Sequence, residues 1–220
     1  MRTFFILTAF YALMEGRAFS KTLMITDSHG EASFGAEMVS LVEAQKEEIV
    51  VFAVGGSTPA DWVLGLNQIW GYWEYHTGGV SIRSTRPKTP KLEELLIKYK
   101  PDRVIIELGT NLVWRDLVVQ DADHIHALIA LTINSGAKCF WIGPPDLRRD
   151  DLDQVNRVEE IHQLLEKEIL AGRCQLIPSW KFTQYPAQGG DGIHYDSIPV
   201  NGSALARKWA RDVAHFMNLN

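Results

Sequence analysis

The sequence predicts a single α/β domain in which a parallel five-stranded sheet lies between two layers of helices. Short apolar runs alternate with amphipathic segments along the chain, which is typical of a parallel sheet covered on both faces. The runs are apolar throughout, as expected for strands buried on both faces. No linker divides the 220 residues, a length for which one core suffices.

The predicted strands are short apolar runs that end in glycine or in polar residues. In chain order they are Thr22–Thr26, Ile49–Val54, Arg103–Leu108, Lys138–Ile142 and Cys174–Ile177. In a parallel sheet their carboxyl ends meet at one edge, where such folds bind their ligands. We therefore look for chemistry in the residues that follow each strand.

The predicted helices show apolar residues at three- to four-residue spacing. They are Ala32–Ala44, Asp61–Trp70, Lys91–Tyr99, Asp121–Ser135, Val155–Leu170 and Ser203–Met217. Pro101 breaks the third helix, and Gly136 and Gly172 end the next two. Between Trp70 and Pro90 the chain is aromatic and then rich in Gly, Ser, Thr and Pro, which predicts a loop with one short strand at Val80–Arg83.

Composition is typical of a soluble globular protein. Hydrophobic residues make up 46% of the chain and charged residues 22%, with a formal net charge of -5. The chain has no Lys/Arg run and no basic stripe, so the sequence argues against a nucleic-acid partner. Its apolar N-terminal stretch is shorter than the roughly 20 residues that a membrane-spanning helix needs.

The N-terminus has the pattern of a secretory signal peptide. Met1-Arg2 is a short positive start, Thr3–Met14 is apolar, and Ala18 and Ser20 form a small-x-small end. We predict a signal peptide over residues 1–20, a mature domain over residues 21–220, and a secreted or periplasmic location. The alternative is a buried N-terminal strand or helix.

The two cysteines, Cys139 and Cys174, each lie in an apolar run that predicts a strand. An even number of cysteines in an exported protein permits a disulfide, provided that the two strands are neighbours. Two buried free thiols are the alternative, because cysteine is among the most buried residue types.

Ser28 directly follows the first predicted strand and precedes a helix. Its hydroxyl would be exposed at the sheet edge, near free backbone N–H groups that can stabilise negative charge. A helix cap is the alternative for Ser28, and likewise for Asn111 after the third strand. Gly55-Gly56, after the second strand, either points an N–H at a ligand or forms a simple turn.

Asp191 and His194 lie three residues apart near the C-terminus. This spacing allows a carboxylate to orient an imidazole so that it takes a proton from a serine. A solvated polar loop is the alternative.

Taken in order, these segments resemble the four blocks of the SGNH (GDSL-type) hydrolases. The matching residues are Thr26-Asp27-Ser28, Gly55-Gly56, Gly109-Thr110-Asn111 and Asp191-Gly192-Ile193-His194. Thr26 replaces the first glycine of the family pattern. Gly143-Pro144-Pro145 and Gly202 also match, and the resemblance spans about Thr22 to Met217. It implies the flavodoxin-like fold of that family.

The resemblance also implies the chemistry. Ser28 would be the nucleophile, His194 the base and Asp191 the group that orients it. The oxyanion hole would consist of the N–H of Ser28, the N–H of Gly55 or Gly56, with Gly56 favoured, and the side-chain amide of Asn111. No metal or organic cofactor is implied.

Three polar features fall outside these blocks. The segment Asp121–His126 contains metal-ligand types but starts an amphipathic helix, where carboxylates complement the helix dipole, so we predict no metal site there. His29 either lines the pocket or lies on the surface. Glu107 is expected to be buried and paired.

Aromatic residues gather after the glycine block and bear on the substrate. Trp62, Trp70 and Trp73 suit stacking on sugar faces, with Tyr72, Tyr75 and His76 nearby. Packing in the core or in a long loop is the alternative for these rings. With the signal peptide, the chain resembles extracytoplasmic O-acetylesterases that act on peptidoglycan or polysaccharide. A lysophospholipase- or thioesterase-like enzyme and a carbohydrate-binding pseudoenzyme stay open.

Overall fold

The computed structural model describes residues 20–219 except 69, 86–87, 115–118 and 149–151. Its strands are β1 (Lys21–Thr26), β2 (Glu48–Val54), β3 (Tyr72–His76), β4 (Val80–Ser84), β5 (Arg103–Glu107), β6 (Lys138–Ile142) and β7 (Gln175–Ile177). Its α-helices are α1 (Ser33–Ala44), α2 (Pro59–Leu64), α3 (Leu92–Tyr99), α4 (Val119–Asn134), α5 (Leu152–Ala171) and α6 (Gly202–Phe216). The predicted signal peptide lies almost wholly outside the described residues and stays a prediction.

The α/β class and the three-layer arrangement are confirmed. Seven strands form one sheet in the order β4-β3-β2-β1-β5-β6-β7. The five predicted strands are its parallel part, and Met24 of β1 pairs with Val51 on one side and Ile105 on the other. Because the strand order reverses at β1, the carboxyl end of β1 faces the crevice in which such sheets bind ligands.

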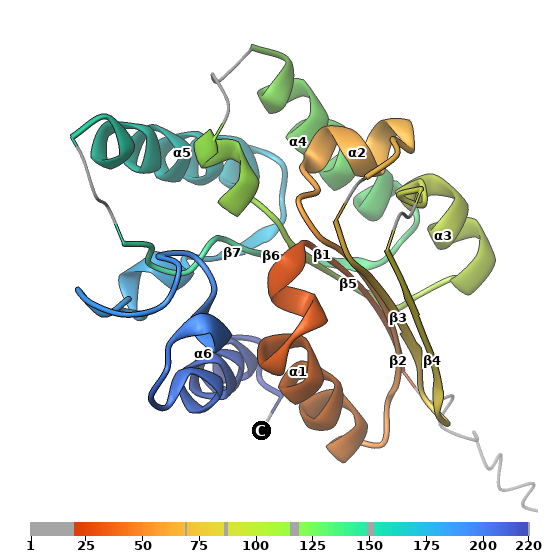
Figure 1. Ribbon diagram of the computed structural model, residues 1–220. Helices are drawn as coiled ribbons and strands as arrows, with labels where there is room; N and C mark the ends of the chain where they lie inside the picture. The colour runs from red at the N-terminus through yellow and green to blue at the C-terminus, as the bar shows by residue number, and fades with distance from the viewer. Residues whose placement is uncertain (1–19, 69, 86–87, 115–118, 149–151, 220) are drawn as a thin grey trace, which may run out of the picture.

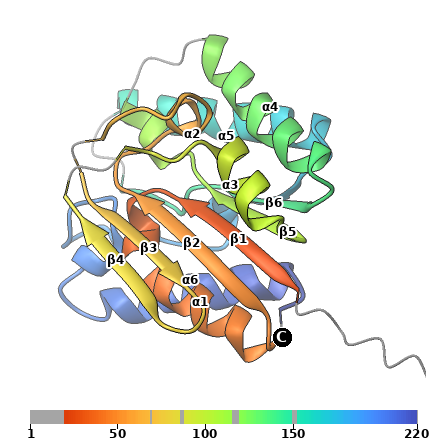
Figure 2. The same cartoon turned by 90° about the vertical axis from the view of Figure 1, so that its right-hand side faces the viewer.

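The predicted number of five strands is wrong, because β3 and β4 add an antiparallel hairpin beside β2 (Figure 2). We expected a loop where β3 lies. The two strands are joined by three residues that include Gly78 (φ 94°) and Gly79 (φ 104°), a backbone region that favours glycine. An aromatic segment followed by Gly-Gly was the available signal for this hairpin.

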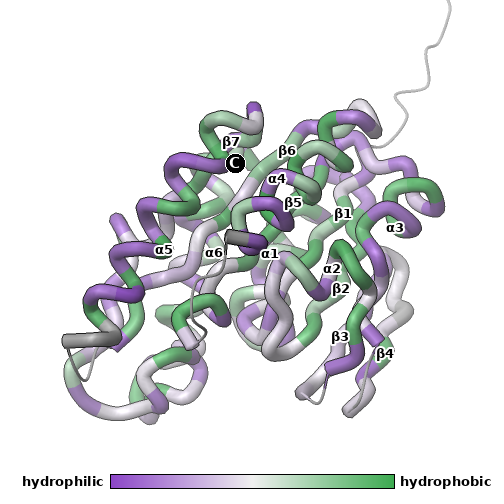
Figure 3. The backbone as a smooth tube through the Cα atoms, turned by 90° about the horizontal axis from the view of Figure 1, so that it is seen from above, coloured by the Kyte–Doolittle hydropathy of each residue, from purple (hydrophilic) through white to green (hydrophobic). Residues whose placement is uncertain are grey.

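The helices cover the two faces of the sheet unequally. Helices α1 and α6 lie on one face, and α2, α3, α4 and α5 on the other (Figures 1 and 2). Along β1, Met24 packs toward α1 and α6, whereas Leu23 and Ile25 join the core under the other helices. Hydrophilic and hydrophobic colours alternate along the outer helices, as amphipathic helices require (Figure 3).

Helix α2 is shorter than predicted and starts two residues earlier. Thr58 and Asp61 form a capping box at its start, and Pro59 occupies the first turn. Gly65, with φ 71°, ends it in the left-handed conformation. The predicted continuation to Trp70 is therefore wrong, since the chain turns back toward β3.

Cys139 and Cys174 form a disulfide. Strands β6 and β7 are neighbours, and Phe140 pairs with Gln175, so the two cysteines lie opposite each other one residue earlier. The disulfide decides between the two alternatives that the sequence left open for these cysteines.

Among the described residues, no helix combines the length and apolar character needed to cross a bilayer.

Candidate active site

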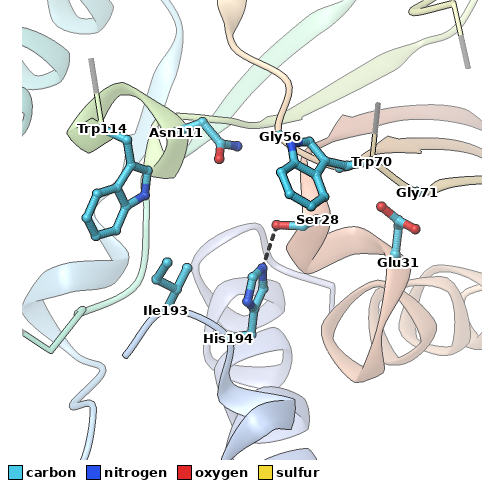
Figure 4. A pocket seen from close by; sticks show the side chains of 10 residues that line it. Ser28, Glu31, Gly56, Trp70, Gly71, Asn111, Trp114, Ile193 and His194 are labelled. Atoms are coloured by element: carbon cyan, nitrogen blue, oxygen red, sulfur yellow. Dashed lines mark hydrogen bonds between the residues drawn. The ribbon is translucent and has the colours of Figure 1, made fainter. Parts of the chain in front are cut away.

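Ser28 lies where β1 ends and a short 3-10 helix, Ser28–Glu31, begins. Asp27 caps this helix, and its Oδ1 accepts a hydrogen bond of 3.0 Å from the N–H of His29. The cap turns the chain sharply, so the Ser28 side chain projects from the sheet edge instead of into the core. There it lines a cavity of about 740 Å³ (Figure 4).

The structure brings Ser28, His194 and Asp191 together although 166 residues separate Ser28 from His194. Ser28 Oγ lies 2.8 Å from His194 Nε2, and His194 Nδ1 lies 2.7 Å from Asp191 Oδ2. With its proton on Nδ1 donated to the carboxylate, the imidazole keeps a lone pair on Nε2 that can accept the Ser28 proton. The three groups thus form one hydrogen-bonded relay, in which the proton of Ser28 can pass to His194 while Asp191 stays ionised.

Asp191 is held in place by its own loop. Its Oδ1 accepts hydrogen bonds from the N–H groups of Ile193 (2.9 Å) and His194 (2.8 Å) and from Ser197 Oγ (3.0 Å). Burial alone would raise the pKa of Asp191, but the bonds from the His194 ring and from the two backbone N–H groups outweigh it and hold this pKa below its usual value. The carboxylate is therefore ionised at neutral pH.

Of the two glycines after β2, only Gly56 offers an N–H to a ligand. The N–H of Gly55 donates to the carbonyl of Gly71 at 2.8 Å, so the prediction of Gly55 as an oxyanion donor is wrong. Gly56 adopts φ 74°. Within the described residues, the N–H groups of Gly56 and Ser28 donate no hydrogen bond, and both residues line the cavity.

Asn111 reaches the same cavity from the short 3-10 helix Thr110–Trp114, which follows β5. Its Nδ2 donates to the carbonyl of Ser57 at 3.0 Å and to Asp27 Oδ2 at 3.2 Å. Asn111 is therefore more than a helix cap. Its amide bridges the loops that follow β1 and β2 in the wall beside Ser28.

A buried pair of acids, Asp27 and Glu107, lies beneath the nucleophile, and both side chains are 0% exposed. Burial raises the pKa of Asp27 to about 6. Burial and the charge of Asp27 raise the pKa of Glu107 well above its usual value. Thr26 Oγ1 donates to Glu107 Oε2 at 2.5 Å, which gives a physical role to the threonine that replaces the family's glycine.

His29 neither lines the cavity nor lies on the surface. It is 3% exposed, and its ring packs 5.2 Å from Trp209 and 5.4 Å from the ring of His194, between centroids. Burial and the nearby His194 lower the pKa of His29 to about 3, so this ring is neutral. It supports the back of His194.

The prediction that Trp62 and Trp73 bind substrate is wrong, because both rings are buried in the core. Trp62 is 0% exposed and its Nε1 donates to Ser57 Oγ at 3.0 Å. Trp73 is 6% exposed and packs in the cluster under α1 and α6. Trp70, in contrast, is 61% exposed and lines the cavity.

Sequence reasoning missed four residues that line the cavity, namely Glu31, Gly71, Trp114 and Ile193 (Figure 4). Each lies within three residues of a predicted site residue, so sequence proximity was the available signal.

At Asp121–His126, where the sequence offers metal-ligand side chains, the structure shows an ion pair instead. His126 Nε2 pairs with Glu168 Oε2 at 2.5 Å, and no three metal-ligand side chains gather within the described ranges.

No protein-family model and no curated protein matches the sequence. Several solved structures match the fold over most of the chain. A catalytic mutant of Axe2, an acetylxylan esterase from Geobacillus stearothermophilus, is 18% identical with a TM-score of 0.59, over 87% of this chain and 93% of that one. TesA is 15% identical with a TM-score of 0.63, over 91% and 100%.

The psychrotrophic esterase EstA from Pseudoalteromonas sp. is 15% identical with a TM-score of 0.58, over 90% of this chain and 99% of that one. Further similar structures are assigned to the SGNH hydrolases and to the G-D-S-L family. The chain therefore has the fold of the SGNH hydrolases, as the sequence blocks predicted.

Proposed function

We propose that the protein is a serine ester hydrolase, and more narrowly an extracytoplasmic O-acetylesterase that acts on a carbohydrate ester. The observation that carries the proposal is the relay Ser28–His194–Asp191, which opens into a cavity beside the backbone N–H groups of Ser28 and Gly56, neither of which donates to another described residue. This arrangement is complete for acyl transfer through a covalent intermediate.

In the first half of the reaction, Ser28 Oγ attacks the ester carbonyl carbon while its proton passes to His194 Nε2. The ionised Asp191 stabilises the resulting imidazolium. The tetrahedral intermediate then collapses, the bond to the alcohol oxygen breaks, and His194 returns the proton to that oxygen. Water repeats the sequence on the acyl-enzyme, which releases the acid and restores the Ser28 hydroxyl.

Three donors stabilise the oxyanion in this proposal: the N–H groups of Ser28 and Gly56 and the Nδ2–H of Asn111. Of the two bonds that Asn111 makes, the one to Asp27 is longer, at 3.2 Å. A negatively charged oxygen in the cavity competes with Asp27 for this hydrogen, because the existing bond to Asp27 is long and a closer charged acceptor makes a stronger bond. Removing one such donor typically costs about 10²–10³ in rate.

The lining of the cavity favours a small acyl group on a carbohydrate. Ile193 is the one aliphatic side chain among the described lining residues, whereas long acyl chains need an extended apolar surface. This counts against the lysophospholipase- or thioesterase-like alternative. The name of the similar acetylxylan esterase agrees with the choice.

Two further points support the proposal. The Cys139–Cys174 disulfide fits an oxidising compartment, in line with the predicted export. The intact relay Ser28–His194–Asp191 counts against a binding protein without turnover.

Hydrolysis of p-nitrophenyl acetate by the wild type and by Ser28→Ala tests the proposal. We expect turnover by the wild type and a loss of at least 10³ in kcat for the variant. Acetyl, octanoyl and palmitoyl esters then rank the acyl groups, and acetate release from acetylated xylan and from O-acetylated peptidoglycan ranks the alcohols. Equal rates for the two proteins, or no turnover by either, refutes the hydrolase. A preference for palmitoyl esters refutes the acetylesterase.

A further inference from the structure

Two exposed tryptophans line the cavity of Ser28. Trp70 precedes β3 and is 61% exposed, and Trp114 ends the 3-10 helix of Asn111 and is 48% exposed. In Figure 4 Trp114 lies to the left of the Ser28–His194 pair, and the Trp70 ring lies above Ser28. The Trp70 ring covers Gly56 so closely that a side chain at Gly56 would collide with it. The cavity thus has two separate aromatic side chains near the reacting hydroxyl.

Glu31 adds a half-buried carboxylate to the same cavity, at the end of the 3-10 helix that Ser28 begins. Its two carboxylate oxygens occupy the space that side chains at Gly55 and Gly71 would fill; a Cβ on Gly55 would lie 2.7 Å from Glu31 Oε1. Arg83 Nη2 donates to the carbonyl of Glu31 at 3.1 Å. The two glycines therefore leave room for this carboxylate at the cavity wall, and Arg83 fixes its backbone.

The cavity is much larger than an acetyl group requires. Its volume of about 740 Å³ falls in the range of about 300–1,000 Å³ typical of pockets that enclose ligands of many atoms. An acyl chain lying over Glu31 would cover a carboxylate without offering it a hydrogen bond, which is costly. A pyranose ring instead offers hydroxyl donors at its edge and apolar C–H groups on its faces.

We propose that the cleft binds several sugars of one glycan chain across Ser28. The chain lies against both Trp70 and Trp114, and a sugar hydroxyl donates to Glu31. The protein then removes acetyl groups from sugars within a chain and prefers oligosaccharides to acetylated monosaccharides. This inference rests on the proposed function and deepens it by naming the form of the substrate.

Binding to the inactive Ser28→Ala protein tests the inference without turnover. The probes are acetylated xylohexaose, an O-acetylated hexasaccharide of the peptidoglycan glycan strand, and the corresponding acetylated monosaccharides, measured by calorimetry. We expect at least one hexasaccharide to bind at least tenfold more tightly than its monosaccharide. Adding Trp70→Ala, Trp114→Ala or Glu31→Gln should each weaken hexasaccharide binding at least tenfold.

Matched controls lie on helix α3, away from the cavity. Ile97→Ala removes an apolar side chain that is 69% exposed, and Glu93→Gln neutralises an exposed carboxylate. Both should leave hexasaccharide binding within about twofold. Equal affinity for hexasaccharide and monosaccharide with both glycans, or losses no larger in the cleft variants than in the controls, overturns the inference.

Kinetics separate this inference from the proposed function. In the protein with Ser28 intact, each cleft variant should lower kcat/KM for the hexasaccharide at least tenfold more than kcat/KM for p-nitrophenyl acetate. Chain-length-dependent binding without any ester hydrolysis refutes the hydrolase and leaves the glycan cleft standing. Hydrolysis of p-nitrophenyl acetate with no dependence on glycan length refutes the glycan cleft alone.

Discussion

Replacing Asp191 by asparagine should reverse the direction of the hydrogen bond between residue 191 and His194 Nδ1, while leaving the loop that carries both residues intact. Asp191 Oδ1 accepts three hydrogen bonds, from two backbone N–H groups and from Ser197. An asparagine must place its oxygen there, because its NH₂ group cannot accept these bonds. The NH₂ group then faces His194 Nδ1 and donates to it. His194 is left with its proton on Nε2, where it cannot take the proton of Ser28.

The size of the loss follows from the geometry. The substitution removes a carboxylate whose oxygen lies 2.7 Å from His194 Nδ1. For unit charges about 4 Å apart the interaction is worth about 1 kcal/mol in water and about 4 kcal/mol at an effective dielectric constant of 20. The side chains are 38% and 45% exposed, which favours a value inside that range. Together with the reversed tautomer, we expect kcat to fall by about 10³, with KM changed by less than about threefold.

Steady-state hydrolysis of p-nitrophenyl acetate and ¹⁵N NMR of the His194 ring measure this prediction. The NMR spectrum should show the neutral ring protonated on Nδ1 in the wild type and on Nε2 in Asp191→Asn. Asp212→Asn, which neutralises a carboxylate paired with Lys208 on α6, is the control and should keep full activity. An Asp191→Asn protein that retains more than a tenth of the wild-type kcat refutes the reasoning, as does a ring still protonated on Nδ1.

Three other predictions follow from the same site and its support. Asn111→Ala should lower kcat by about 10²–10³ with little change in KM, measured with p-nitrophenyl acetate; a loss below threefold contradicts its role as an oxyanion donor. As the pH rises from 5 to 8, the free energy of unfolding of Glu107→Gln should increase relative to that of the wild type. The raised pKa of Glu107 means that its stabilising contribution is present below the unfolded pKa and is lost with rising pH, by at most about 1.4 kcal/mol per pH unit. Urea unfolding at several pH values checks this, and a difference independent of pH contradicts it. Replacing Cys139 and Cys174 together by alanine should cost about 4 kcal/mol, from the loop entropy of a 35-residue separation, and lower Tm by about 10 °C. A loss below 1 kcal/mol contradicts that estimate.

The parallel part of the sheet could be predicted because its signals are local. Each parallel strand is a short apolar run such as Ile49–Val54, and each is followed by a helix with apolar residues on one face. The hairpin β3–β4 escaped prediction because it lies at the sheet edge, where strands carry polar and aromatic residues. In Tyr72–His76 the pattern is half-buried, and its pairing with β2 is a contact across the fold.

Burial separated the tryptophans in a way that composition could not. Trp62, Trp70 and Trp73 fall within twelve consecutive residues and are chemically identical. Trp62 lies on the inner face of α2 and Trp73 on the inner face of β3, whereas Trp70 occupies the connection between these elements. Which ring is exposed depends on which elements pack over it. Trp114 could be identified as a cavity residue only from the tertiary structure, because the segment after β5 lies beside Ser28 only in the folded chain.

The sequence by itself determined the order of the parallel strands along the chain and the polar residues that follow them, including Ser28, Asn111 and the Asp191–His194 pair. These follow from local periodicity and motif spacing. The tertiary structure decided that the N–H of Gly55 is bonded to Gly71 whereas that of Gly56 has no partner among the described residues. It also decided that Glu31, Trp70 and Trp114 share the cavity with Ser28, and that Cys139 meets Cys174. Each of these depends on contacts between distant segments, because a hydrogen-bond partner or a solvent-exposed face exists only after the elements have packed.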